Sequence, residues 1–487
     1  MSSRHLRELF FFHLVAITLE NMNTFSESSV PVPSSAVVAP RLRVIDVRGR
    51  QLSSRELKSI VPRQGSEYVG SAQRSVDEIL ARVKSEGAPY LRELSLRFDG
   101  VGQDALRVPA EALERATDSL DAEVRRGLEI AIERTRAFAQ VQRPDDARIE
   151  VAPGAVLVHR WTPVARAGVY VPGGLAVYPS SVIMNVVPAQ AAGVESIVLC
   201  TPPQKEFDGL PHPTILAAAH LLGVTEVWAI GGAQALGAMA YGVHDDVADA
   251  TGQTHVLEPV DTITGPGNIF VAMAKRALQG VVGTDGEAGT TEICVLADES
   301  ANPEFVATDL ISQAEHDPHA GSVLVTHSPD VVEQVQAAIA RRAVATKHAE
   351  RVKQALEGEQ SGVVLTDSLE QSIAVADAYA AEHLEIHTEN AREVAARIRN
   401  AGAIFIGSYS PVPLGDYAAG SNHVLPTGGS ASFASGLCTT SFMKAVQLIE
   451  YSESALAEIG KSIVAVAENE DLPAHGEAIT ARTESHR

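Results

Sequence analysis

The second half of the chain carries four pairs of polar residues that could bind a metal ion or transfer protons. They are Gln313 and His316, Glu382 and His383, Asp416 and His423, and Glu470 and His475. Imidazole, carboxylate and amide ligands together suit a zinc-type divalent ion with one position open to substrate, whereas a structural zinc normally uses thiolates. Adjacent glutamate and histidine side chains can act as a general base and a proton shuttle. These residue types indicate a catalytic site, although the chain's 16 histidines and 61 acidic residues also allow such groupings without function.

The segment 302–318 predicts a helix that presents the first of these pairs. Asn302 is a favourable N-cap, and Pro303 fits the first helical turn, where no N–H is needed. The Asp-Pro pair at the end of the segment should stop the helix near His316. Gln313 lies three residues earlier and therefore points the same way. A histidine at a helix C-terminus can also simply complement the helix dipole, so this pair alone leaves both interpretations open.

Composition narrows the class of protein. The length of 487 residues favours about three domains, and no run of 18 apolar residues predicts a membrane span. The formal charge of −22 repels phosphate backbones and anionic lipid, so neither nucleic acid nor a membrane is an expected partner. The three cysteines, Cys200, Cys294 and Cys438, form no metal or disulfide pattern. Cysteine usage of this kind predicts a reducing compartment and thus a cytoplasmic protein.

Residues 1–40 differ in character from the rest. An apolar patch, Leu9–Ile17, is followed by a segment rich in Ser, Pro and Val. Glu8 and His13 interrupt the pattern of a signal peptide, and no convincing cleavage site follows. We therefore predict a disordered leader, with Met22 as an alternative first residue.

The remaining chain predicts an α/β protein. A short strand in RLRVIDV precedes a mostly helical part, in which Ser75–Glu78 forms a capping box that opens a helix closed by Gly87. From Val151 onward, short β-branched runs alternate with helical segments, as expected of buried parallel strands. A second such series begins at Thr290–Asp298. It is followed by the long loop Gly407–Gly429, which we expect to be functional because of its length, by an amphipathic helix in 452–468, and by a helical tail.

Three glycine-containing loops follow predicted strands in the first of these series. They are Gly168–Gly174, Ala229–Gln234 and Thr264–Asn268. Ligands of open α/β sheets bind at the carboxyl ends of the strands, and glycine lets backbone N–H groups approach phosphates. The loops therefore predict a nucleotide site, although no GxGxxG fingerprint is present and each loop alone could be only a tight turn.

From about Arg41 to Arg482 the chain resembles the histidinol dehydrogenase family. The resemblance rests on the ordered motifs GVYVPGG, AIGGAQALGAMAYG, TGPGN, AGTTE, DLISQAEH, AEHLEI and GDYAAGSNHVLPT, and on the tail ending in Ala474-His475. It implies two incomplete Rossmann-like parallel-sheet domains with a helical N-terminal part and a small helical C-terminal tail. It also implies oxidation of L-histidinol to L-histidine through an aldehyde, with two NAD reduced, in the last steps of histidine biosynthesis.

The resemblance also implies roles for individual residues. One Zn2+ per subunit would be bound by Gln313, His316, Asp416 and His475, and Glu382 would activate water while His383 shuttles protons. The substrate would contact these metal ligands and His383 as well as Thr291, His423 and Glu470; the nucleotide would contact Tyr170, Gln234 and Asn268. The family is a homodimer in which the C-terminal tail of each subunit reaches the other subunit's site.

We accordingly expect four parts in the chain: the leader 1–40, a main domain with the metal site in 41–169 and 290–440, a nucleotide domain in 170–289 and a tail in 441–487. The sequence departs from the family at Thr290, where proline is usual, and in a longer region between Ala229 and Asn268. Two alternatives use the same ligands, namely a zinc hydrolase and a zinc and NAD dehydrogenase for another small alcohol.

Overall fold

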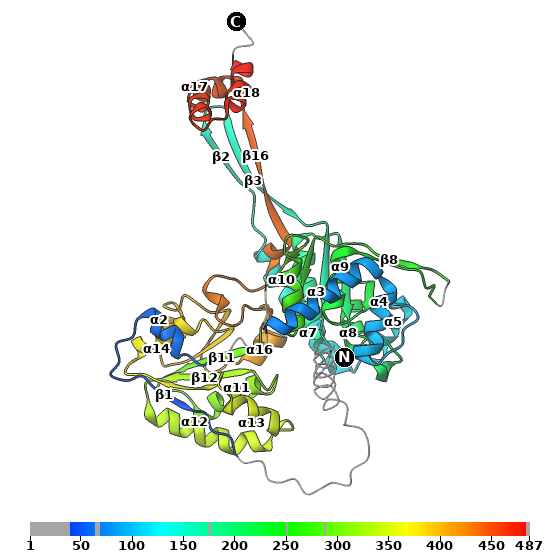
Figure 1. Cartoon of the computed structure of the whole chain (residues 1–487). Coiled ribbons are helices and arrows are strands. Elements are labelled where there is room, and N and C mark those ends of the chain that lie inside the picture. Colours follow the sequence, from blue (N-terminus) through cyan, green and yellow to red (C-terminus); the bar gives the residue numbers. More distant parts are fainter. Residues whose placement is uncertain (1–38, 64–68, 174–176, 250–251, 287–288, 484–487) are drawn as a thin grey trace, which may run out of the picture. The chain divides into compact units, whose positions relative to one another are not determined.

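The computed structural model describes residues 39–63, 69–173, 177–249, 252–286 and 289–483. Pro40–Arg487 form one compact unit, and Figure 1 shows its elements. The predicted leader, apart from its last two residues, lies outside the described residues.

A six-stranded parallel sheet forms the first layered part, with the order β1-β13-β12-β11-β14-β15. Its strands are β1 (Val44–Asp46), β11 (Glu292–Ala297), β12 (Gly321–Thr326), β13 (Gly362–Leu365), β14 (His383–His387) and β15 (Ala403–Ile406). One face packs on α11 (Pro303–Ala314), α12 (Pro329–Arg342) and α13 (Ala349–Glu357). The other packs on α2 (Ser54–Ile60), α14 (Leu369–Tyr379) and α15 (Ala391–Ala395).

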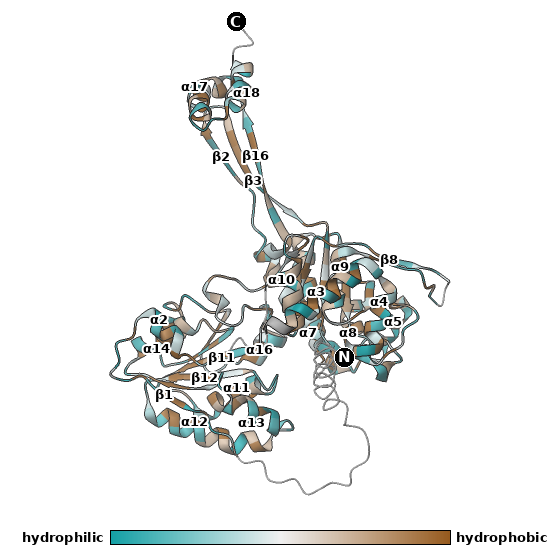
Figure 2. Ribbon diagram, viewed as in Figure 1, coloured by the Kyte–Doolittle hydropathy of each residue, from teal (hydrophilic) through white to brown (hydrophobic). Residues whose placement is uncertain are grey.

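Alternation of side chains along a strand explains this double covering. In β11, Ile293 and Val295 belong to the cluster with α11, whereas Cys294 and Leu296 belong to the cluster with α14. Because both faces are covered, the strand is apolar almost throughout, as the sequence predicted. In Figure 2 the strands of this sheet are largely brown, in contrast to the teal on the outer sides of the helices.

A five-stranded parallel sheet forms the second layered part, with the order β10-β9-β4-β5-β6. Its strands are β4 (Arg166–Tyr170), β5 (Ser196–Thr201), β6 (Glu226–Ala229), β9 (Thr262–Thr264) and β10 (Gly283–Thr284). One face packs on α3 (Val69–Glu86), α4 (Ala88–Leu94), α9 (Gly232–Tyr241) and α10 (Ile269–Leu278). The other packs on α5 (Ala110–Asp118), α6 (Ala122–Val141), α7 (Pro179–Ala192) and α8 (Pro213–Leu221). A hairpin of β7 (Val243–Asp245) and β8 (His255–Leu257) is attached.

Two parallel sheets covered by helices confirm the predicted fold class. The packing of the N-terminal helices differs from the grouping that we predicted, since α3 to α6 share their apolar clusters with the five-stranded sheet and not with the six-stranded one. Only the stretch around β1 and α2 joins the six-stranded sheet. Periodicity predicts that a helix has an apolar face but does not say which sheet covers it.

A three-stranded antiparallel sheet was predicted only in part: strands were expected from Val151 onward, but β16 and the antiparallel pairing were missed. It pairs β2 (Ala147–Ala152) and β3 (Ala155–Pro163) with β16 (Met443–Tyr451), which runs beside the whole of β3. Because most residues of β16 are exposed, its apolar pattern does not alternate as in a half-buried strand. The tail helices α17 (Glu453–Asn469) and α18 (Pro473–Thr483) follow, and both were predicted.

The boundaries of α11 and α3 can be compared with the helix starts and ends predicted from capping residues. Asn302 caps α11 by accepting from the Glu304 N–H at 2.9 Å, as predicted. The helix ends at Ala314, two residues before His316. The predicted start at Ser75 is wrong because α3 already begins at Val69, so the apparent capping box lies inside a helix. Ser and Glu three apart also occur within helices, and the motif alone is therefore ambiguous.

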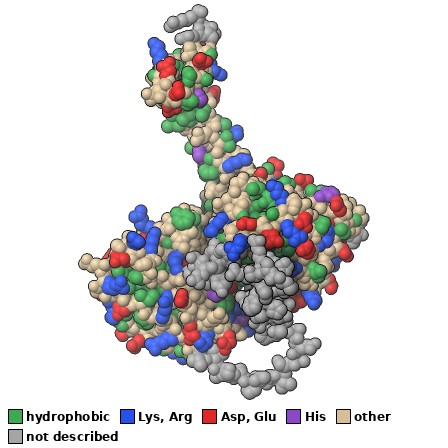
Figure 3. All heavy atoms as spheres, in the orientation of Figure 1, with side chains coloured by type: hydrophobic (Ala, Val, Ile, Leu, Met, Phe, Trp, Pro, Cys, Tyr) green, Lys and Arg blue, Asp and Glu red, His purple; other side chains and the backbone are tan. Residues whose placement is uncertain are grey.

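Acidic and basic side chains are interspersed on the face of the molecule that Figure 3 shows. Among the described residues, no helix has the length and apolar character needed to cross a membrane.

Candidate active site

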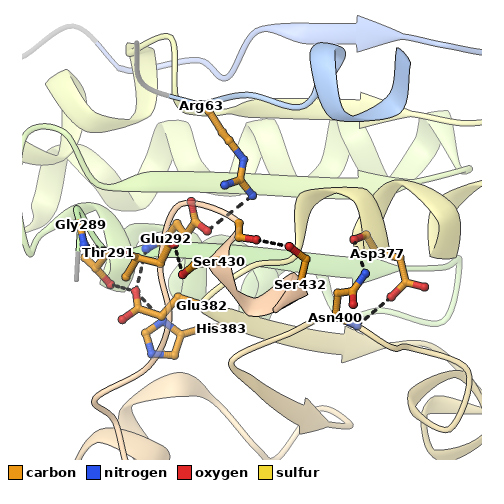
Figure 4. A network of polar contacts seen from close by, with 12 residues as sticks. Arg63, Gly289, Thr291, Glu292, Asp377, Glu382, His383, Asn400, Ser430 and Ser432 are labelled. Atoms are coloured by element: carbon orange, nitrogen blue, oxygen red, sulfur yellow. Dashed lines mark hydrogen bonds and ion pairs between the residues drawn. The ribbon is translucent and has the colours of Figure 1, made fainter. Parts of the chain in front are cut away.

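A chain of hydrogen bonds joins three elements at one end of the six-stranded sheet. The Gln313 amide, in the last turn of α11, donates from Nε2 to the Thr291 Oγ1 at 2.7 Å. The Thr291 hydroxyl donates in turn to Oε2 of Glu382, and the Glu292 backbone N–H donates to the same oxygen at 3.0 Å. Figure 4 shows Thr291, Glu292, Glu382 and His383 from close by. The position of the Glu382 carboxylate is thus specified by two donors from the edge of β11.

Strand pairing explains why these residues meet. Ile293 in β11 pairs with His383 in the parallel neighbour β14, so Thr291 and Glu382 both lie immediately before the amino ends of adjacent strands. The Thr291 carbonyl also accepts from the Gly321 N–H at 3.0 Å, which fixes the start of β12 beside them. The site therefore lies at the amino edge of this sheet, and not at the carboxyl edge where open α/β sheets usually bind ligands.

Glu382 has the properties of a general base. Burial raises its pKa to about 7, while the hydrogen bonds from Thr291 and from the Glu292 N–H oppose that rise because they stabilise the carboxylate. A carboxyl that titrates near neutrality can both accept a proton and release it again. The residue is 7% exposed, so its field acts in a largely water-free environment.

His383 lies beside this base as a neutral ring. Its Nδ1 is 3.6 Å from Oε2 of Glu382. Burial lowers the pKa of His383, and the charge of Asp416 opposes that shift. Both ring nitrogens are buried without a hydrogen-bond partner among the described residues. A neutral imidazole with free nitrogens is suited to accept a proton from a bound ligand.

The titration of His383 is coupled electrostatically to those of His316, Asp416 and His423. Burial raises the pKa of Asp416 to about 6, and the charge of His383 opposes this rise. Burial, and then the charge of His383, lowers the pKa of His316. Burial lowers the pKa of His423 to about 4. For His316, His383 and His423 alike, burial thus lowers the pKa and favours the neutral ring.

The loop after β15 is folded so that it delivers two of these residues. Asp416 lies in the short helix α16 (Val412–Tyr417). The His423 Nδ1–H donates to the Asp416 carbonyl at 3.0 Å, and its Nε2 lies 3.3 Å from the Ser181 hydroxyl on α7. These contacts order the loop, and its functional role stays a prediction.

The donor set around His383 fits a divalent metal ion. Gln313 Oε1 is buried and has no hydrogen-bond partner among the described residues, while the amide nitrogen is held by Thr291. A fixed amide oxygen, the neutral imidazole of His316 and the Asp416 carboxylate are ligands that zinc accepts. Without a cation, the orphaned Gln313 oxygen would remain an uncompensated polar atom.

A second group of possible ligands, Asp309, Glu385 and His387, was missed in the sequence. Their ligand atoms all lie within 4.8 Å of one another. The sequence HLEIH could have revealed this group, because alternate residues of a strand point to the same side, so His383, Glu385 and His387 must project from one face of β14. Burial, and then the charge of Glu385, raises the pKa of Asp309, which favours a carboxyl that shares a proton with Glu385. The group is a second candidate for binding a divalent ion. We favour the Gln313 set because the family resemblance implies it and because Gln313 Oε1 has no hydrogen-bond partner among the described residues.

A buried ion pair behind the base was also missed. Glu292 opens the buried strand β11, and its Oε1 lies 3.7 Å from Nη2 of Arg63. The Arg63 guanidinium stacks 4.6 Å above the centre of the Tyr379 ring. Burial raises the pKa of Glu292 to about 7, which the charge of Arg63 opposes. A charged residue in an otherwise apolar strand was the signal in the sequence.

Glu470 and His475 lie in the C-terminal tail. Glu470 is the C-cap of α17, and His475 lies in α18. Both line a groove of about 370 Å³ together with apolar residues such as Ile459, Val466 and Leu472. Among the described residues, no hydrogen bond or ion pair joins either of them to the Glu382 network.

The described parts of the three glycine loops lie at the carboxyl ends of β4, β6 and β9, as predicted; Gly174, the last residue of the first loop, lies outside the described residues. The Tyr170 hydroxyl accepts from the Gly232 N–H at 2.9 Å, so it links two of the loops. Asn268 is exposed and caps α10 by accepting from the Phe270 and Val271 N–H groups. Gln234 is buried in the first turn of α9.

A family model, curated relatives and a solved structure all match the chain to the same family. The family model described as "Histidinol dehydrogenase" matches residues 63–483. The chain is 54% identical over 444 residues to a histidinol dehydrogenase of Corynebacterium diphtheriae, covering 91% of this chain and 98% of the relative. It is 52% identical over 445 residues to that of Mycobacterium tuberculosis, covering 91% and 99%. The crystal structure of histidinol dehydrogenase from Elizabethkingia anophelis is similar with a TM-score of 0.83 at 32% identity, covering 92% and 99%.

The hydrogen bond from Thr291 predicts a change in the titration of Glu382. Thr291→Val removes a donor that stabilises the carboxylate, so the pKa of Glu382 should rise above its value of about 7. The conservative variant Thr291→Ser keeps a hydroxyl and should titrate as the wild type does. The pKa can be measured in metal-free protein from the carboxyl infrared bands, with Glu382→Gln identifying the band. An unchanged pKa in Thr291→Val would show that the hydroxyl does not hold the carboxylate.

Proposed function

Because the chain belongs to the histidinol dehydrogenase family, we propose that it oxidises L-histidinol to L-histidine through histidinal, reducing two NAD+. As a member of that family the chain is an enzyme, an oxidoreductase of histidine biosynthesis. The observation that carries the proposal is the hydrogen-bonded chain from Gln313 through Thr291 to Glu382, because it couples a candidate metal ligand to a buried base.

One Zn2+ per subunit would be held by Gln313, His316, Asp416 and the partner subunit's His475. Two observations support this set, namely the unpaired Gln313 oxygen and the neutral state that burial favours for His316. When bound, zinc would supply a fixed positive charge that orients the substrate and polarises its reacting oxygen. Thr291, His423 and the tail residue Glu470 would provide further polar contacts to L-histidinol.

In the first oxidation, His383 would accept the hydroxyl proton of the substrate while the carbinol C–H leaves as hydride to NAD+. Burial, which lowers the pKa of His383, keeps the ring neutral and ready to accept that proton. The products are histidinal, NADH and a protonated His383. The proton must then leave the site before the second turnover of NAD+.

In the second oxidation, Glu382 would accept a proton from water as the water oxygen attacks the aldehyde carbon. The resulting hydrate anion then loses its C–H as hydride to the second NAD+, which gives the carboxylic acid. The acid releases its remaining proton to solvent and becomes the carboxylate of L-histidine. Aldehyde oxidation can instead use a cysteine nucleophile. Cys200 and Cys294 are buried in strands, where burial raises the pKa of each thiol, so both suit a structural role.

NAD would bind at the carboxyl edge of the five-stranded sheet. Tyr170, Gln234 and Asn268 belong to three loops that meet there, and Asn268 places the N-terminus of α10 at this edge. A helix N-terminus attracts the phosphates of a dinucleotide. All three cysteines are free, which supports a cytoplasmic enzyme.

We further propose a homodimer in which α17 and α18 complete the site of the other subunit. Exposed apolar side chains on the three-stranded sheet and the tail support this proposal. They include Ile149, Ile449, Val466 and Leu472, with Ile449 70% exposed. Apolar surface of this extent favours burial against another protein.

Turnover with L-histidinol tests the proposed activity. The zinc-loaded enzyme should form two NADH per L-histidinol consumed, and chelation should abolish the reaction. His316→Ala and Asp416→Ala should each lose zinc and turnover, because each removes a ligand that no neighbour replaces. Zinc content is measured by metal analysis of the purified variants. Hydrolytic turnover without NAD would favour the zinc hydrolase, and a variant that kept one zinc per subunit would remove that residue from the ligand set.

Mixing two inactive variants tests the exchange of tails. Glu382→Gln damages the body of a site, whereas His475→Ala damages a tail. If tails cross between subunits, a mixed dimer contains one site with both changes and one with neither, so refolding the variants together should restore activity. If each tail serves its own subunit, every site in the mixture carries one change and activity stays at the level of the separate variants.

A further inference from the structure

A buried ion pair holds the turn that connects β9 to α10. Lys275, in α10, donates from Nζ to the Gly265 carbonyl at 2.6 Å and to Oδ1 of Asp285 at 2.5 Å. Oδ2 of Asp285 accepts from the Gly265 N–H at 2.9 Å. The backbone N–H and the backbone carbonyl of Gly265 are therefore both hydrogen-bonded to the same ion pair.

The pair lies within an apolar environment. The Lys275 and Asp285 side chains are 2% and 3% exposed, and α10 packs into the apolar cluster beneath the five-stranded sheet. Burying two charges is costly, and apolar residues of similar volume are often as stabilising. Stability alone therefore gives little reason for this pair, whereas an ion pair with directed hydrogen bonds can select one backbone conformation.

Gly265 must adopt an unusual conformation in a confined space. Its φ is +125°, and a Cβ atom there would lie 2.0 Å from the Tyr170 carbonyl oxygen. The turn is thus pressed against the end of β4. The hydroxyl of the same tyrosine accepts from the Gly232 N–H, so Tyr170 contacts both of the neighbouring loops.

We propose that Lys275 and Asp285 are positioning residues for the dinucleotide, since together they hold the turn Thr264–Asn268 in one conformation against Tyr170. This inference rests on the proposed binding of NAD at the carboxyl edge of the five-stranded sheet. Neither residue needs to touch the nucleotide. Because the turn is already ordered before NAD binds, binding does not cost the conformational entropy of ordering it.

The test replaces the charges while keeping the fold. In Lys275→Met/Asp285→Asn, the apolar chain fills the space of the lysine, and the amide oxygen can still accept from the Gly265 N–H. The ammonium group that donates to the Gly265 carbonyl is lost. No charge is left buried alone, so this double variant should fold even if Lys275→Met does not. We expect the KM for NAD to rise at least about tenfold, with the KM for L-histidinol and the zinc content as in the wild type.

A matched control removes an ion pair from the other end of the same sheet. Arg166 and Glu226, 2.7 Å apart, are the first residues of β4 and β6, so Arg166→Met/Glu226→Gln should leave the KM for NAD unchanged. A similar rise in that control, or a rise in both KM values with loss of zinc in the test variant, would overturn the positioning role in favour of general destabilisation. A wild-type KM for NAD in the test variant would overturn it too. Wild-type enzyme that reduces no NAD would instead refute the proposed function itself.

Discussion

The hydrogen bonds that converge on Oε2 of Glu382 are the constraint on which the candidate site depends. Thr291 donates to this oxygen and accepts from Gln313, so the last turn of α11, the edge of β11 and the start of β14 are tied together. An unpaired carboxylate at this depth would be strongly destabilising. The same bonds that compensate its burial also orient it, and for this reason the packing of the sheet and the placement of the base cannot be separated.

The candidate functional residues lie at opposite edges of the two parallel sheets. In the six-stranded sheet, Thr291, Glu382 and His383 lie at the amino ends of the strands, whereas in the five-stranded sheet the glycine loops lie at the carboxyl ends. The proposed nucleotide site therefore follows the usual rule for open α/β sheets, whereas the candidate site of the six-stranded sheet departs from it. The amino edge of the six-stranded sheet carries the polar side chains of Thr291, Glu382 and His383.

Much of the fold was predictable because local signals were strong. The apolar runs that became β5, β6, β11 and β12 were predicted as buried parallel strands, and Asn302 was predicted as the cap of α11. The strand β16 was not predicted because its faces are mostly exposed and give no alternation. The helices α3 to α6 were assigned to the wrong sheet, since periodicity carries no information about the packing partner. Within the site, the four polar pairs were singled out from their residue types. Thr291 and the individual roles came only from the resemblance to a family. Arg63, Glu292 and the Asp309 group were missed because they depend on the pairing of distant strands and helices.

The central claim is that Glu382 is the base that activates water in the second oxidation. The most direct measurement compares the oxidation of histidinal by NAD+ with its reduction by NADH in Glu382→Gln, because only oxidation requires the deprotonation of water. The amide keeps the size of the side chain and can still accept from Thr291 and the Glu292 N–H, so zinc content should not change. We expect the oxidation to slow by about 10²–10⁴-fold while the reduction is largely retained. Equal losses in both directions would contradict the claim and would leave Glu382 with a role in positioning alone.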